Sequence, residues 1–361
     1  MKHSFLKQII LIYIFLCVFC LVSFAWKKEP EAECKALYPF AAKNQNKEKR
    51  NREKEGYIDC NGKVILPPQF DSASSFNEGI GLVYVRKSDG FSYGKLINLK
   101  GEIVTNESTQ VFSGFSEGLA PALMPEGYGY VNEKGETAFL VKHKLDKNYD
   151  GDPISHFSEG LAYIVTDEGI GFIDKSGEIV IKPQFGYTSG FKNGMAAVMT
   201  MDGKWAVINK RGEYIVEPQE ETITPPSDGI AVLGKGGNWK CLNEKGQMIL
   251  QVFHDVLGNF HDGLAQFKSK TNGKWGFIDK SGRIVVAPKY DSVDDFSEGL
   301  TTVLISNRVE FINTKGEVQT SLKVTDVYEG FKNELAYVRI GNYDAYINKN
   351  GRIIWKLSNP K

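Results

Sequence analysis

Residue types that build most catalytic and metal sites are scarce in this sequence. Only five of its 361 residues are histidine and five are cysteine, and no histidine pair joins cysteines at the spacing of zinc ligands. Motifs that would mark a nucleophile elbow, a phosphate-binding glycine loop or an EF-hand calcium loop are also absent. The sequence therefore predicts no catalytic residue, no metal ligand and no cofactor, and we expect that the protein is not an enzyme.

An excess of either charge is missing as well. Lys and Arg together number 44, and Asp and Glu together number 44, so the chain lacks the basic surplus of nucleic-acid-binding proteins. Helical periodicity is absent from the repeat region, whereas 37 glycines and 13 prolines indicate many turns, as in β-rich folds. We expect an all-β protein without a nucleic-acid partner.

The longest apolar run is at the N-terminus. Lys2 and Lys7 precede an uncharged run of 17 residues at 9–25, which ends in Ser23-Phe24-Ala25. Such an ending fits cleavage of a signal peptide, although a run of this length lies at the lower limit for a bilayer span. Residues 1–25 are therefore a signal peptide, a retained membrane anchor or a lipoprotein signal. In each case the rest of the chain is exported to the periplasm, the cell surface or the medium.

Cysteines beyond this leader are too few for a disulfide framework. Only Cys34, Cys60 and Cys241 remain, which is an odd and sparse set. A Cys34–Cys60 bridge is the pairing that an oxidising compartment would allow, and the sequence leaves open whether it forms.

A charged segment at 43–55 separates the leader from the rest of the chain. It holds six basic residues, three acidic residues and no apolar residue, so it cannot bury enough surface to fold by itself. We interpret residues 26–55 as a charged linker or a divergent first unit, and residues 56–361 as the main domain.

One pattern recurs from residue 56 onward, with a period near 35 residues. Its sharpest element is an Asp/Asn-x-x-Gly turn that occurs nine times, at spacings of 34 to 42 residues. The first and last residues of these turns are Asp59 and Gly62, Asn98 and Gly101, Asn132 and Gly135, Asp174 and Gly177, Asn209 and Gly212, Asn243 and Gly246, Asp279 and Gly282, Asn313 and Gly316, and Asn348 and Gly351. Asp or Asn accepts a hydrogen bond from the backbone two residues on, and glycine adopts positive φ at little cost. Each unit therefore contains a β-hairpin with a glycine bulge.

A second element, Phe-x-acid-Gly-Leu-Ala, precedes each hairpin with some variation. It occurs at Phe76, Phe115, Phe157, Phe191, Phe260, Phe296 and Phe331, and it opens a further strand. Acids recur inside it at Glu78, Glu117, Glu159 and Glu298. We interpret these acids as structural, because a catalytic pair needs two carboxylates in different environments.

Residues 273–279 read Gly-Lys-Trp-Gly-Phe-Ile-Asp, and this segment resembles the WG (KWG) repeat of bacterial proteins. The resemblance extends over roughly residues 56–355. It places Trp205, Trp239 and Trp275 in the tryptophan position of the repeat, which holds Tyr128, Ile170, Val309 or Asp344 in other units. That variation favours a packing role for this position. The family has no accepted catalytic residues, so the resemblance implies none.

Two architectures fit about nine tandem units. One is a propeller-like ring of small antiparallel blades, and the alternative is an open β-solenoid. Eight or nine units suit a large propeller, although 35 residues are fewer than the roughly 40–45 of a typical four-stranded blade. We favour the ring.

A repeat array outside the cytoplasm suggests a platform for binding or scaffolding, because such arrays present large rigid surfaces and concentrate function in loops. We expect a protein partner in the cell envelope, and membrane contact only through residues 9–25 if they stay uncleaved. The irregular connections before the third and fourth units, including 142–153, are the candidate partner site. Glycan or cell-wall binding is the alternative, and it requires exposed Trp205, Trp239 and Trp275.

Overall fold

The computed structural model describes residues 34, 36–42, 54–87, 90–146, 148–219, 221–320 and 322–357. The leader at 1–25 and residues 43–53 lie outside the described residues. Contacts divide the chain into Met1–Cys34 and Lys35–Lys361, and every described strand lies in the second unit. Strands are the only regular secondary structure among the described residues, none of which forms a helix that could cross a bilayer.

The strands form eight sheets, in which neighbouring strands pair antiparallel. The first three sheets contain β1 (Tyr38–Ala42), β2 (Lys54–Ile58) and β3 (Val64–Phe70); β4 (Ser72–Ala73), β5 (Ile80–Arg86) and β6 (Ser92–Asn98); and β7 (Gln110–Val111), β8 (Ala120–Met124), β9 (Gly127–Val131) and β10 (Thr137–Leu140). The fourth contains β11 (Ala162–Thr166), β12 (Gly169–Ile173), β13 (Ile179–Thr188), β14 (Met195–Thr200), β15 (Trp205–Asn209) and β16 (Tyr214–Gln219).

The remaining four sheets follow in chain order. They contain β17 (Thr222–Ile223), β18 (Ile230–Lys235), β19 (Asn238–Asn243) and β20 (Met248–Val252); β21 (Val256–His261), β22 (Leu264–Lys268), β23 (Trp275–Asp279) and β24 (Ile284–Tyr290); β25 (Ser292–Val293), β26 (Leu300–Ile305) and β27 (Arg308–Asn313); and β28 (Val324–Lys332), β29 (Leu335–Ile340), β30 (Tyr343–Asn348) and β31 (Ile353–Leu357).

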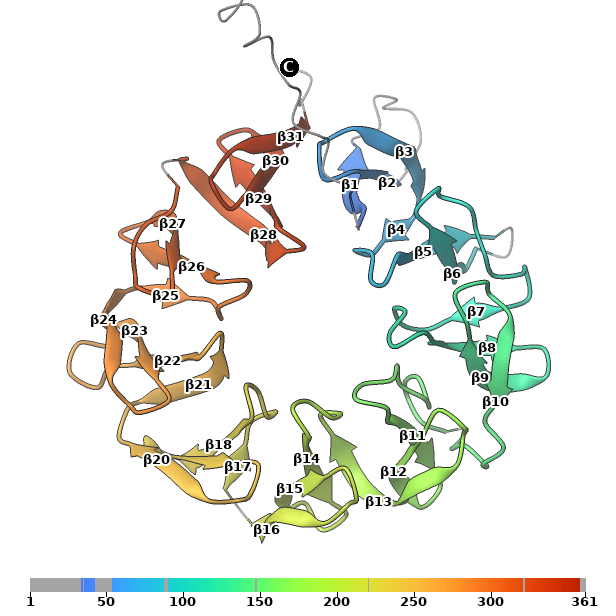
Figure 1. Cartoon of the computed structure of the whole chain (residues 1–361), viewed down its shortest axis with the longest axis horizontal. Coiled ribbons are helices and arrows are strands. Elements are labelled where there is room, and N and C mark those ends of the chain that lie inside the picture. Colours follow the sequence, from blue (N-terminus) through green and yellow to red (C-terminus); the bar gives the residue numbers. More distant parts are fainter. Residues whose placement is uncertain are drawn as a thin grey trace, which may run out of the picture. The chain divides into compact units, whose positions relative to one another are not determined.

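Figure 1 shows these sheets arranged in a ring, with the first strand of each sheet towards the centre and the last strand towards the rim. The prediction of an all-β propeller-like ring is therefore confirmed, and the open solenoid is wrong. The nine repeat turns give eight sheets because the fourth and fifth units share β13. This strand pairs with β12 through Ile181 and with β14 through Thr188, so one strand serves both units.

The nine Asp/Asn-x-x-Gly turns have one common geometry. At Asp279, the side-chain Oδ1 accepts hydrogen bonds from the amides of Ser281 and Arg283, each at 3.0 Å, and the Gly282 amide donates to the Asp279 carbonyl at 2.8 Å. The other eight turns repeat this pattern, and all nine glycines have φ between +73° and +83°. The turn is therefore fixed by its own four residues.

The hydrophobic core lies in the seams, which we define as the boundaries between consecutive repeat units. In five seams, an aromatic ring two residues before the turn packs against the phenylalanine of the next unit's Phe-x-acid-Gly element. Phe277 and Phe296 pack in this way with ring centroids 4.8 Å apart, as do Phe172 and Phe191. Both members of each pair are at most 3% exposed, so each unit contributes half of two seams.

A different aromatic contact closes the ring between the last unit and the first. Tyr346 on β30 packs against Tyr38 on β1 with centroids 5.6 Å apart, and its hydroxyl donates to the Pro39 carbonyl at 2.6 Å. An interior seam holds the same kind of bond, from the Tyr130 hydroxyl to the Ser155 carbonyl at 2.7 Å. Closure therefore uses side-chain packing between two separate sheets, and β1 belongs to the first sheet although it precedes residue 56.

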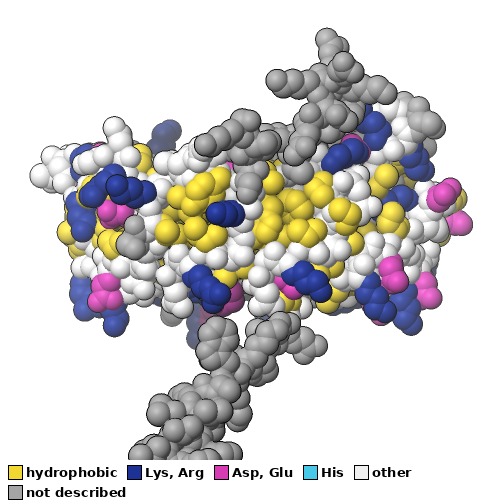
Figure 2. Space-filling view, turned by 90° about the horizontal axis from the view of Figure 1, so that it is seen from above, with side chains coloured by type: hydrophobic (Ala, Val, Ile, Leu, Met, Phe, Trp, Pro, Cys, Tyr) yellow, Lys and Arg dark blue, Asp and Glu magenta, His cyan; other side chains and the backbone are white. Residues whose placement is uncertain are grey.

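The outer strands keep apolar side chains on the rim. Two residues after the turn glycine, seven units expose an apolar or aromatic side chain, namely Val64, Ile103, Ile179, Tyr214, Met248, Ile284 and Val318. Figure 2 shows one side of the rim, where apolar side chains lie among charged ones. Prolines such as Pro183 and Pro288 in these outer strands lack an amide donor, which discourages edge-to-edge pairing.

Cysteines occupy two different situations. Cys34 and Cys60 are both disulfide-bonded, as the proposed bridge requires. Cys241 is a free thiol buried in a seam, and burial raises the pKa of this thiol to about 12.

Ring closure can be tested by truncating Tyr346. We expect Tyr346→Ala to lower the free energy of unfolding by about 3–5 kcal/mol, as for other buried aromatics, and to increase the radius of gyration because the ends separate. Urea unfolding and small-angle X-ray scattering measure the two effects.

The matched control is Tyr130→Ala, because Tyr130 stands at the same position of its unit and also donates to a carbonyl of the next unit, across an interior seam that the chain itself spans. This variant should lose similar stability without the increase in radius of gyration. Equal radii in the two variants would contradict a closure that depends on Tyr346.

Candidate functional site

The connection at 141–153, which we call the strap, departs most clearly from the repeat. It leads from β10 at the rim of the third sheet to the inner edge of the fourth sheet. Its start is fixed by the Val141 amide, which donates to the Tyr128 carbonyl at 2.9 Å. Its far end closes on one residue of β11, because the Asp146 amide donates to the Val165 carbonyl at 3.0 Å and the Val165 amide donates to the Pro153 carbonyl at 2.8 Å.

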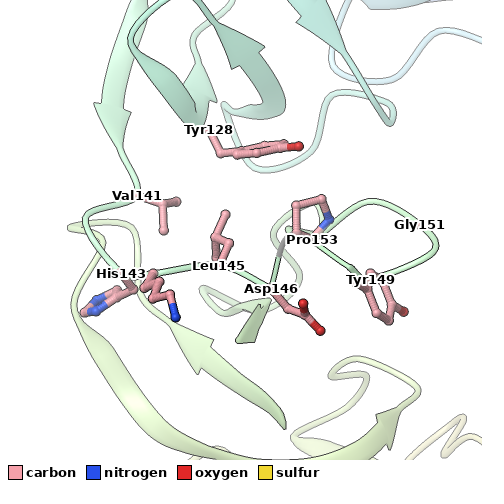
Figure 3. A pocket seen from close by; sticks show the side chains of 9 residues that line it. Tyr128, Val141, His143, Leu145, Asp146, Tyr149, Gly151 and Pro153 are labelled. Carbon is pink, nitrogen blue, oxygen red and sulfur yellow. The ribbon is translucent and has the colours of Figure 1, made fainter. Parts of the chain in front are cut away.

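A pocket of about 410 Å³ lies between the strap and β9 (Figure 3). Apolar groups from Tyr128, Val141, Leu145 and Pro153 form part of its lining. Polar groups in the lining belong to His143, Lys144, Asp146 and Tyr149. This volume falls within the usual range of ligand pockets, roughly 300–1,000 Å³. The combination of an apolar surface with a few polar groups suits an inserted side chain of a partner.

Bonds within the strap and to neighbouring residues hold several of these groups in place. His143 Nε2 lies 3.2 Å from the Gly177 carbonyl oxygen in the neighbouring turn. Lys144 forms an ion pair with Asp167, and this partner raises the pKa of the lysine. Asp146 Oδ1 accepts from the Asn148 amide at 2.8 Å. Tyr149 stays 41% exposed and is the aromatic side chain of the strap.

The connection before the third unit, which was also a candidate partner site, has a different structure. The side chain of Lys95 on β6 is buried beside this connection. Its ammonium donates to the carbonyls of Asn106, Glu107 and Thr109 at 2.6, 2.9 and 2.6 Å. Burial lowers the pKa of Lys95. The segment folds around this lysine, so we place the candidate site at the strap.

Trp205, Trp239 and Trp275 are each half-buried in seams. Trp205 packs edge-on against Tyr187 with centroids 5.4 Å apart, and Trp239 Nε1 donates to the His254 carbonyl at 3.1 Å. In the third unit Tyr128 occupies the tryptophan position, and there it lines the strap pocket. The sequence pattern assigned Tyr128 to this position but gave no sign of the pocket beside it.

The recurring acids link six of the units to the unit that follows. Glu78 accepts hydrogen bonds from the amides of Glu117 and Gly118 at 2.8 and 2.9 Å, one unit further along. Glu298 does the same with Asn333 and Glu334 at 2.6 and 2.9 Å. The remaining acids at this position also accept from the next unit's turn: Glu117, Glu159, Asp228 and Asp262. We call this contact the carboxylate latch.

These acids stand at a position that disfavours them. Glu78, Glu117, Glu159, Asp228, Asp262 and Glu298 have φ between +50° and +55°, a conformation that costs a residue with a side chain about 1–2 kcal/mol. The carboxylate's hydrogen bonds to the next unit offset that cost. The geometry therefore gives these acids a structural role in joining units.

A lysine from the next unit reinforces three of the latches. Lys349 Nζ lies 3.1 Å from Glu298 Oε2, and Lys175 Nζ lies 3.1 Å from Glu117 Oε2. Lys280 instead donates to the Asp228 carbonyl at 2.8 Å. Burial alone would raise the pKa of Glu298, but the amides of Asn333 and Glu334 together with Lys349 outweigh it and lower the pKa.

No group of three or more His, Cys, Asp or Glu residues within the described part of the chain could hold a metal ion. The strap pocket contains one histidine and one aspartate, without the paired carboxylates or nucleophile that hydrolytic chemistry needs. Its arrangement suits recognition of a surface.

These sheets and their ring define the class of protein: the chain is a β-propeller. It is also a WG-repeat protein, since segments 56–89, 170–205, 206–239, 241–275 and 275–308 match the family model of the WG containing repeat. Among curated proteins, none matches the chain in sequence.

Solved structures resemble the chain at low sequence identity. A structure titled "Crystal structure of the eukaryotic initiation factor" is 11% identical, with 90% of this chain and 96% of that chain covered and a TM-score of 0.57. A second, apo AztD from Citrobacter koseri, is 14% identical, with 90% of this chain and 95% of that chain covered and a TM-score of 0.41. The first likeness supports the propeller fold and nothing about function.

The carboxylate latch predicts how stability depends on pH. Because the pKa of Glu298 is lowered on folding, its contribution is present above its ordinary value of 4.5 and is lost as the pH falls through the lowered pKa. We expect Glu298→Gln to reduce the free energy of unfolding by about 1 kcal/mol at neutral pH, and to flatten the loss of stability below pH 4.5. Urea unfolding between about pH 3 and pH 7, a range that brackets the ordinary pKa of a glutamate, measures both effects.

Glu133→Gln is the control, because Glu133 is exposed and lies outside the latches. Its pH profile should match that of the unmodified protein. Identical profiles for Glu298→Gln and the unmodified protein would remove the latch as a source of stability.

Proposed function

We propose that this protein is a non-enzymatic interaction platform outside the cytoplasm, and that its partner is a protein that docks at the strap. The observation that carries the proposal is the strap pocket, which lies where the chain leaves its repeat pattern. Function in repeat proteins concentrates in such departures, while the repeated residues maintain the scaffold. Exposed Tyr149 beside an apolar pocket resembles the centre of a binding interface, where tyrosines are enriched.

The leader at 1–25 and the cysteine chemistry support export. A basic start, an apolar run and small residues near Trp26 are the features of a secretory signal. Cys34 and Cys60 are disulfide-bonded, and structural disulfides persist in oxidising compartments outside the cytoplasm. We therefore propose the periplasm, the cell surface or the medium as the place of action, with retention at a membrane if residues 9–25 stay uncleaved.

Site-resolved crosslinking tests the docking proposal. The tagged full-length protein is crosslinked in cells, and the captured proteins are compared between the unmodified chain and Tyr149→Ala. We expect a discrete partner that is captured at least about tenfold less by Tyr149→Ala, since loss of a central interface aromatic commonly costs 2 kcal/mol or more.

Tyr214→Ala is the matched control, because Tyr214 on the outer strand β16 is 40% exposed, against 41% for Tyr149. Capture that survives in Tyr214→Ala and falls in Tyr149→Ala supports the strap as the docking site. Capture that both variants retain would show that the partner binds elsewhere.

Glycan binding is the second candidate function, and it can be tested through the fluorescence of the repeat tryptophans. If Trp205, Trp239 and Trp275 form stacking platforms, soluble cell-wall oligosaccharides should quench their fluorescence in the full-length protein. Because all three are half-buried in seams, we expect quenching by less than about a tenth, well below that of an exposed stacking site. Saturable quenching that disappears in Trp275→Phe would favour the glycan function over the protein partner.

A further inference from the structure

A second pocket, of about 370 Å³, lies in the seam between the fourth and fifth units. Its apolar side is formed by Leu161, Phe172 and Phe191, and its inner edge by small residues of the first strands, including Ser155, Ser189 and Gly190. Basic groups also line it, namely His156 and Lys192. The strap pocket shares none of these residues.

The seam between the seventh and eighth units shows what the corresponding position holds when it is filled. There Asp295 precedes Phe296, and its carboxylate accepts from Gln266 Nε2 at 3.0 Å and lies 3.4 Å from His261 Nε2. The carboxylate thus occupies the space between two consecutive units. Its donors come from the preceding unit, and the acid comes from the following one.

Alignment of the repeats places Gly190 where Asp295 stands, because Gly190 precedes Phe191 as Asp295 precedes Phe296. The same alignment pairs Tyr163 with Gln266 and Ser158 with His261. A Cβ built at Gly190 would meet no heavy atom within 4 Å. The fourth seam therefore lacks the internal carboxylate, and open space takes its place.

Groups that can bind a carboxylate surround this space. Tyr163 lines the pocket with a hydroxyl that can donate, and burial together with the charges of Tyr149 and Asp152 raises its pKa, so the hydroxyl stays protonated at neutral pH. Lys192 is exposed and makes no ion pair within the described residues. The nearby carboxylate of Glu159 is already engaged by the amides of Asn193 and Gly194.

We propose that this pocket binds a small organic carboxylate, whose acid group takes the position that the Asp295 carboxylate occupies three seams away. Lys192 and Tyr163 contact the acid group, and His156 also lines the pocket. Phe172, Phe191 and Leu161 contact the apolar body of the ligand. In the seam between the seventh and eighth units this carboxylate belongs to Asp295 of the chain itself, and in the seam between the fourth and fifth units the ligand would provide it.

Benzoate is the probe, because it joins a carboxylate to an aromatic body, and benzamide is its neutral analogue. Binding to the purified full-length protein is followed by ligand-observed NMR titration. We expect benzoate to bind with a Kd in the millimolar range or tighter, and benzamide to bind at least about tenfold more weakly, because it lacks the charged hydrogen-bond acceptor.

Two pairs of variants locate the binding. Lys192→Gln should weaken benzoate binding about tenfold, while Lys332→Gln, the equivalent lysine after Phe331, should leave it unchanged. Gly190→Asp should abolish binding by supplying the carboxylate from the chain, whereas Gly114→Asp, at the equivalent glycine before Phe115, should not. Thermal unfolding checks that each variant is folded, and if Gly190→Asp is not, the lysine pair decides.

Three results would overturn the assignment. They are equal binding of benzoate and benzamide, no benzoate binding at concentrations up to about 10 mM, and equal effects of Lys192→Gln and Lys332→Gln. None of these results bears on the strap, because capture of the protein partner is measured with Tyr149→Ala in a separate experiment.

Discussion

The whole ring depends on contacts across seams, because no single unit can bury its own apolar residues. In five seams, an aromatic side chain of one unit packs against the phenylalanine of the next, as Phe277 does against Phe296. The carboxylate latch adds a directional bond at the same boundary, always from one unit to the turn of the next. Stability is then approximately a sum over seams, so a unit with an exposed seam would be the weakest part of an open array.

Closing the ring removes that weakness. Tyr346 packs against Tyr38 and donates to the Pro39 carbonyl, whereas Tyr130, at the same position of its unit, packs against Phe157 and donates to the Ser155 carbonyl. Both tyrosines bond across a seam, but Pro39 lies on β1 and Ser155 lies before β11. The last unit therefore finds in β1 the partner that every other unit finds in its neighbour along the chain. No strand of the last sheet pairs with the first, so side-chain packing is what brings these two distant parts of the sequence together.

Local features were predictable from the sequence, and relations between units were not. The Asp279 turn follows from four residues, since its hydrogen bonds stay within the turn and the two residues flanking it. The partners of Glu298 lie 35 and 36 residues away, and finding them requires the arrangement of one unit beside another. The sequence singled out 142–153 as irregular, but the contacts of the strap and the carbonyl ligands of Lys95 were beyond prediction for a different reason. They replace the repeat with contacts that occur once, so no second copy exists from which to infer them.

The two pockets, like the contacts that the sequence did not predict, lie where the chain departs from its repeat. A repeated side chain that joins units, such as Glu298 or Phe296, is already engaged by its neighbours. The two pockets lie at positions where the units differ from one another. Gly190 omits a carboxylate that Asp295 supplies in the equivalent seam, and the strap omits the regular connection from rim to centre. In a ring built from one repeated contact, departures from the repeat are therefore the places where a ligand or partner can replace part of the chain.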